Sequence, residues 1–123
     1  MAYKTKWREQ CEAARLIRDR FGLDRALVYL VNEKFRTFVQ IADNDRSFAD
    51  EVPAFAAELK TIFTPEELRA HLMQLRRRRI ASRLAIGAET FADAHLLVDR
   101  LSWLLLGSRV HSVGGRAKRE ALQ

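Results

Sequence analysis

The sequence predicts an all-α protein, and three features support that prediction. Apolar residues recur at steps of three and four along almost the whole chain, as in amphipathic helices, and no segment alternates like a half-buried strand. Hydrophobic residues make up 48% and charged residues 31% of the 123 residues, which is typical of a globular protein. Capping and helix-ending residues separate the apolar segments. We therefore expect a compact single-domain bundle of four or five helices over residues 1–107, followed by a flexible basic tail over residues 108–123.

The first expected helix spans residues 7–21. Its apolar stripe consists of Trp7, Cys11, Ala14, Ile17 and Phe21. Gly22 suits the left-handed backbone position just past a helix, because it has no side chain to clash there. Asp24 can cap the next helix through its carboxylate.

The second expected helix, residues 24–42, is apolar on more than one side. One face carries Leu27, Leu30, Val31, Phe35, Phe38, Val39 and Ala42, whereas Val28, Tyr29 and Ile41 fall on the other side. Such a helix is usually central in its bundle. The polar turn "ADNDRS" follows, in which Ser47 can cap a short helical turn. Pro53 then forces a boundary or a kink, because it lacks an amide proton, and helix resumes over residues 54–63 with Phe55, Leu59, Ile62 and Phe63.

The segment "TPEEL" is the clearest helix start in the chain. Thr64 can cap, Pro65 suits the first helical position, and Glu67 completes a capping box three residues after the cap. A last helix is expected over residues 90–106, and Gly107 ends it. Its apolar face carries Phe91, His95, Val98, Leu101 and Leu105, with Leu97, Trp103 and Leu104 elsewhere.

Positive charge is concentrated in the second half of the chain. The net charge is +6, yet residues 1–62 hold 11 Lys and Arg against 10 Asp and Glu, while residues 63–123 hold 11 against 6. Six arginines and no acidic residue occur between positions 69 and 83. We call this set the arginine zone: Arg69, Arg76, Arg77, Arg78, Arg79 and Arg83. A localised basic zone indicates a polyanion or an acidic protein surface as partner.

The apolar face changes side within the run "RRRR". At about 100° per residue, the stripe of Leu68, Leu72 and Leu75 would continue through Arg79, whereas Ile80 and Leu84 lie well over 90° away. The run therefore marks a helix end or kink. We expect Arg76, Arg77 and Arg78 to be largely exposed, and Leu72, Leu75, Ile80 and Leu84 to enter the core.

Two functions and one simpler interpretation fit the arginine zone. A solvated charged face is the simplest, since charge runs are usually that. The favoured function is non-catalytic nucleic-acid binding, as an accessory subunit or regulator, through the zone and the tail residues Arg116, Lys118 and Arg119. The planar arginine fork suits phosphate better than the point charge of lysine does. The alternative is a protein-binding inhibitor or adaptor, of the type made by phages and mobile elements, that uses the same arginines on an acidic partner.

The segment "RIASRLAIGAETFADAHL", residues 79–96, is similar to the helix-turn-helix of response-regulator transcription factors. The similar spacing runs through Ile80, Ala81, Leu84, Ile86, Thr90, Phe91, His95 and Leu96. This resemblance implies DNA binding by the helix that begins near Thr90. The segment departs from the pattern at Asp93, Leu97 and Asp99, where base- or phosphate-contacting residues are needed.

No catalytic motif, cofactor site or metal site is expected. The pairs Glu67 with His71, and His95 with Asp99, are each one helical turn apart but supply too few carboxylates for the usual bundle metal site. The segment "SVGGRAK" lacks the flanking strand and helix of a phosphate loop. Cys11, the single cysteine, is expected to be a buried, inert thiol in a reducing compartment.

Cellular location and assembly state also follow as expectations. No apolar run approaches the roughly 18 residues of a membrane span, and the first residues lack the apolar core of a signal peptide. We therefore expect a cytoplasmic protein without membrane contact. Two helices richer in apolar residues than one core needs suggest a homodimer or docking onto a larger assembly.

Overall fold

The all-α fold is confirmed by a computed structural model that describes residues 6–77 and 91–108, with side chains from residue 97 onward in the second range. Within these ranges every regular element is helical and none is a strand. The chain divides into two compact units, Met1–Pro65 and Glu66–Gln123. No helix in the described ranges is long and apolar enough to cross a membrane.

The first helix, α1 (Trp7–Phe21), has the predicted bounds. Gly22 ends it with φ of 103°, and its N–H donates to the Ile17 and Arg18 carbonyls at 3.2 Å each. A side chain would be strained at this φ, which explains the glycine. The expectation that Asp24 caps the next helix is wrong: α2 (Leu23–Leu27) already begins at Leu23, and Asp24 lies in its first turn.

A continuous helical stretch follows, in three parts: α2, the π-helical segment η2 (Val28–Phe35) and α3 (Arg36–Ala42). Its extent agrees with the helix expected over residues 24–42. All seven residues predicted for its apolar face are buried: Leu27, Leu30, Val31, Phe35, Phe38, Val39 and Ala42. The π-helical segment was not predicted by the sequence pattern.

Two helices complete the first unit, α4 (Arg46–Ala49) and α5 (Val52–Ile62). Asp45, not Ser47, caps α4: the Asp45 carboxylate accepts the Ser47 N–H at 3.0 Å and the Ser47 hydroxyl at 2.6 Å. Pro53 lies in the first turn of α5, so the predicted boundary is confirmed. Proline is tolerated there because the first amides of a helix have no intrahelical partner.

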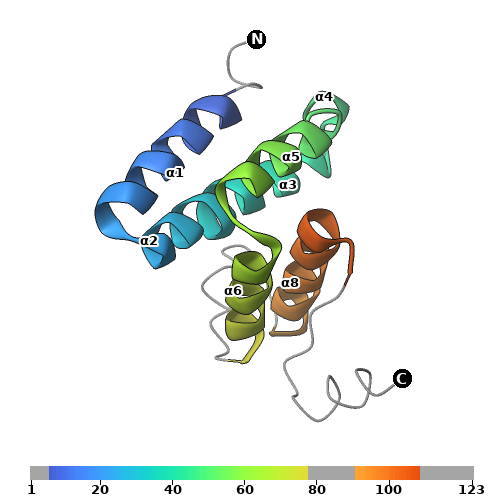
Figure 1. The fold of residues 1–123 in the computed structure, drawn as a ribbon. Coiled ribbons are helices and arrows are strands. Elements are labelled where there is room, and N and C mark those ends of the chain that lie inside the picture. Colours follow the sequence, from blue (N-terminus) through green and yellow to red (C-terminus); the bar gives the residue numbers. More distant parts are fainter. Residues whose placement is uncertain (1–5, 78–90, 109–123) are drawn as a thin grey trace. The chain divides into compact units, whose positions relative to one another are not determined.

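Phe55 of α5 is at the centre of the aromatic core of the first unit. Its ring stacks on Trp7 of α1, with centroids 5.4 Å apart, and meets the edges of Phe35 and Phe38 at 5.0 and 5.3 Å. Phe38 in turn contacts Phe48 of α4. Within this unit, Figure 1 shows α1 and α5 packed on the long helical stretch that runs from α2 to α3. Aromatic pairs thus connect five of its helical elements: α1, η2, α3, α4 and α5.

The second unit contains α6 (Pro65–Arg77) and α8 (Phe91–Leu106). Pro65 occupies the first position of α6, as predicted, and α8 begins within one residue of its expected start. Gly107 follows α8 with φ of 71°, and its N–H donates to the Trp103 carbonyl at 3.0 Å. The expected tail lies outside the described residues except for Ser108.

Candidate functional site

The helix α6 carries the first three members of the arginine zone. Its buried stripe is Leu68, Leu72 and Leu75, as the sequence predicts. Arg69, at the flank of this stripe, and Arg77, opposite it, are both exposed. Eight residues of helix separate them by about 12 Å along the axis. Two unburied guanidinium groups at that spacing can contact separate phosphates or carboxylates of one extended anionic partner.

Arg76 has a different environment from Arg77. Its guanidinium forms an ion pair with the Asp99 carboxylate of α8, and each of the two side chains is only 15% exposed. The expectation that Arg76 is largely exposed is therefore wrong. Arg76 lies at the flank of the buried stripe, and its pairing with Asp99 of α8 shields it, whereas Arg69 on the same flank is exposed.

All the remaining predicted site residues lie outside the described residues. This group comprises Arg78, Arg79, Arg83, Arg116, Lys118 and Arg119, together with the predicted core residues Ile80 and Leu84. The described part of α6 reaches Arg77, so the predicted kink within "RRRR" also lies outside it. Of the segment similar to a helix-turn-helix, only the backbone of the start of α8 is described. Farther along α8, Asp99 is bound by Arg76.

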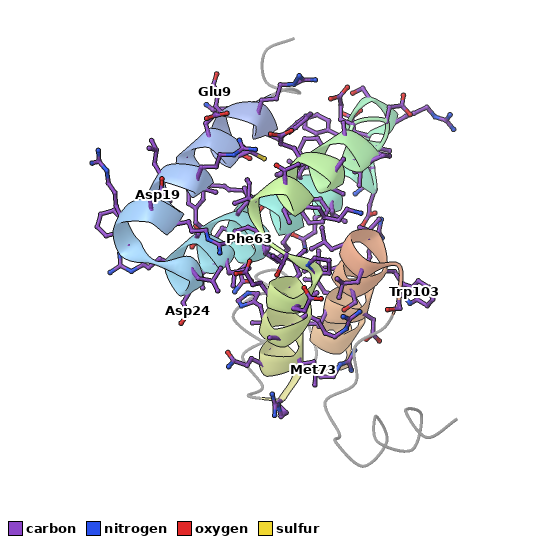
Figure 2. The ribbon with its side chains drawn as sticks, viewed as in Figure 1. Glu9, Asp19, Asp24, Phe63, Met73 and Trp103 are labelled. Atoms are coloured by element: carbon purple, nitrogen blue, oxygen red, sulfur yellow. The ribbon has the colours of Figure 1, made fainter. Side chains whose placement is uncertain are left out.

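The helix α8 has one buried and one exposed side. Val98, Leu101 and Leu105 are buried as predicted, and the buried Ser102 hydroxyl donates to the Val98 carbonyl at 2.9 Å. Trp103 projects from α8 and is 59% exposed (Figure 2). Its position off the apolar stripe was the sequence signal for this exposure. A large exposed aromatic ring is typical of protein interfaces.

A polar seam between α1 and α5 was not predicted. Arg15 donates to the Glu58 carboxylate at 2.6 Å and to the Thr61 hydroxyl at 2.8 Å. Arg18 donates to the Ile62 carbonyl at 2.7 Å. Trp7 donates its indole N–H to Glu51 at 3.1 Å. These partners are 43 to 46 residues apart in sequence, so no local pattern could pair them.

A shallow cavity of about 310 Å³ lies at this seam, lined by Trp7, Arg8, Glu9, Glu12 and Glu58. The Arg8 guanidinium covers the Trp7 ring at 4.6 Å from its centroid. Glu12 and Glu58 are both engaged by Arg15. The seam therefore joins α1 to α5 through the Arg15–Glu58 ion pair as well as through aromatic packing.

Cys11 lies in the interior of the first unit. Cys11 is fully buried, as predicted, and burial with the nearby Glu58 charge raises the pKa of its thiol to about 12. The thiol is therefore un-ionised and a poor nucleophile at neutral pH. Within the described ranges, no three His, Cys, Asp or Glu side chains are grouped so as to hold a metal ion.

Comparison with protein-family models, curated proteins and solved structures gives no match for this chain.

Proposed function

We propose that this chain is a non-catalytic nucleic-acid-binding protein whose arginine zone contacts the phosphate backbone. The observation that carries the proposal is the exposure of both Arg69 and Arg77 on α6, outside its buried leucine stripe. Their unit, Glu66–Gln123, holds 11 Lys and Arg against 6 Asp and Glu, whereas the first unit holds 11 against 10. A basic unit in a chain whose other unit is nearly neutral supports a dedicated anion-binding part of the chain.

The test compares two double substitutions that remove the same charge. In Arg69→Gln/Arg77→Gln the removed guanidiniums come from the arginine zone, and in Arg20→Gln/Arg25→Gln they come from exposed positions of the first unit. Binding to a fluorescent DNA or RNA duplex is followed by anisotropy. The first variant should bind more weakly than the second. Equal weakening of duplex binding in the two variants would mean that only net charge matters. The arginine zone would then not be the binding site.

A protein-binding inhibitor or adaptor is the second candidate, and the exposed Trp103 favours it. Tryptophan and arginine are the residues most enriched at binding hot spots, and α8 carries this ring in the same unit as the arginines. A pull-down from the native host separates the two candidates. Loss of all partners after nuclease treatment supports nucleic acid. A protein that is retained by the native chain after nuclease but lost with Trp103→Ser supports the second candidate.

A further inference from the structure

The centre of the long helical stretch in the first unit has π-helical hydrogen bonding. The backbone N–H of Arg36 donates to the Val31 carbonyl, five residues earlier, and to the Glu33 carbonyl. An α-helix would direct this N–H to the carbonyl of Asn32, four residues earlier. The π-helical segment is eight residues long, whereas π-helices are mostly single turns found at functional positions.

The exposure of two side chains agrees with the π register and disagrees with the α register. At the α-helical step of about 100° per residue, Val28 would lie within about 20° of Phe35, in the middle of the buried stripe. Lys34 would lie between Leu27 and Leu30, also within that stripe. With the smaller step that accompanies i→i+5 hydrogen bonding, about 80° per residue, Val28 lies roughly 160° from Phe35 and Lys34 lies at the edge of the stripe. In the structure Val28 is 42% exposed, whereas Phe35 is fully buried.

A contact across one turn supports the same register. The Lys34 ammonium lies over the Tyr29 ring, 5.3 Å from its centroid. These residues are five apart in sequence, which is one π-helical turn. On an α-helix, neighbours on one face are three or four residues apart, and residues five apart diverge.

The Arg36 side chain, rather than the Arg36 backbone N–H, donates to the Asn32 carbonyl. Its Nε donates to the Asn32 carbonyl at 2.8 Å, and its Nη1 donates to the Gln40 side-chain oxygen at 2.6 Å. The residue is only 8% exposed, and burial lowers the pKa of its guanidinium. It forms no ion pair with a carboxylate in the described part of the chain. A buried guanidinium bound only to neutral acceptors is costly, so its contact with the backbone calls for a structural reason.

We propose that Arg36 is a register lock: by binding the Asn32 carbonyl with its side chain, it holds Val28–Phe35 in the π-helical register. Without the guanidinium at this carbonyl, the backbone N–H of residue 36 donates to Asn32, four residues earlier, and the segment returns to the α register. That change turns Val28 and Lys34 toward the buried face. The helix therefore has two possible sets of outward side chains, and Arg36 selects one of them.

The test measures scalar couplings across backbone hydrogen bonds by NMR in the full chain. In the native chain, the amide nitrogen of Arg36 should couple to the carbonyl carbon of Val31. In Arg36→Met and in Arg36→Lys the coupling should move to the carbonyl carbon of Asn32, because neither variant has a donor at the Nε position. Arg25→Met, which removes an exposed arginine from α2, is the matched control and should keep the native coupling.

Three results would overturn the proposal. One is a native coupling from Arg36 to Asn32, and another is an unchanged Val31 coupling in Arg36→Met. The third is retention of the π register in Arg36→Lys, which would assign the effect to charge. If Arg36→Met fails to fold, Lys34→Leu/Arg36→Met removes the charge that opposes the α register. That variant should fold with the Asn32 coupling, and a Val31 coupling in it would contradict the lock.

Discussion

Arg76 of α6 and Asp99 of α8 form an ion pair that is largely shielded from solvent, although Arg76 belongs to a run of four arginines. The neighbouring Arg77 is exposed. Two adjacent residues of the same type thus have different roles: Arg76 joins two helices of the second unit, and Arg77 is available to a partner. The effects of substitution should differ accordingly.

We predict that Arg76→Met lowers the free energy of unfolding by about 3 kcal/mol, because it leaves the Asp99 carboxylate shielded without its cation. Arg77→Met should change it by no more than about 0.5 kcal/mol, as exposed substitutions do. Urea denaturation monitored by circular dichroism measures both. The double variant Arg76→Met/Asp99→Leu should recover most of the loss, since it removes both charges. Equal stability of the two single variants would contradict the structural role of Arg76.

The buried stripe of α6 gives a second prediction. Leu72→Ala and Leu75→Ala should each cost about 2–5 kcal/mol, because each removes a buried side chain and leaves a cavity. Trp103→Ala removes a larger side chain from an exposed position, so its cost should stay near 0.5 kcal/mol. Thermal or urea unfolding measures the loss of stability in each of the three variants. If Trp103→Ala were the most destabilising of the three, Trp103 would have to be packed rather than exposed.

The start of α4 gives a third prediction, which concerns its capping residue. Asp45→Ala should destabilise the chain by about 1 kcal/mol, because the Asp45 carboxylate accepts the Ser47 amide at the helix start. Ser47→Ala keeps that bond and loses only the hydroxyl contact, so its cost should be smaller. Denaturant midpoints of the two variants provide the comparison. If Ser47→Ala were more destabilising than Asp45→Ala, Ser47 would be the capping residue.

Cys11 provides a prediction about pH. The pKa of its thiol is raised from 9.0 to about 12 in the folded chain. Between these values the unfolded chain loses the proton and the folded chain keeps it, so stability falls as pH rises, by about 1.4 kcal/mol per pH unit. Cys11→Ala should lack this decline. The quantity to measure is the difference in unfolding free energy between the two chains from pH 8.5 to 10.5, and parallel curves would contradict the shift.

Helix positions and buried faces were predictable from the sequence, because both depend on local spacing. The stripe of α6 and its start at Pro65 are examples. On α1 the pattern was right for Trp7, Cys11 and Ala14 but wrong for Phe21, which is 63% exposed at the end of the helix. The Arg76–Asp99 pair and the Arg15–Glu58 pair were not, since each joins residues that only tertiary packing brings together. The π-helical segment was missed because helical-wheel analysis assumes the α step throughout. Asp45 and Ser47 are both good caps, and the pattern did not choose between them.

The central claim is that the exposed arginines of the zone bind nucleic-acid phosphates, and salt dependence tests it most directly. The affinity of the native chain for a duplex is measured at several salt concentrations. The logarithm of the association constant should fall linearly with the logarithm of salt concentration, with a slope steeper than about −1.8 for two or more phosphate contacts. Arg69→Gln/Arg77→Gln should reduce the magnitude of that slope by about 1.8, and Arg20→Gln/Arg25→Gln should leave it unchanged. A slope near zero, or one unaffected by loss of Arg69 and Arg77, would contradict phosphate binding by the arginine zone.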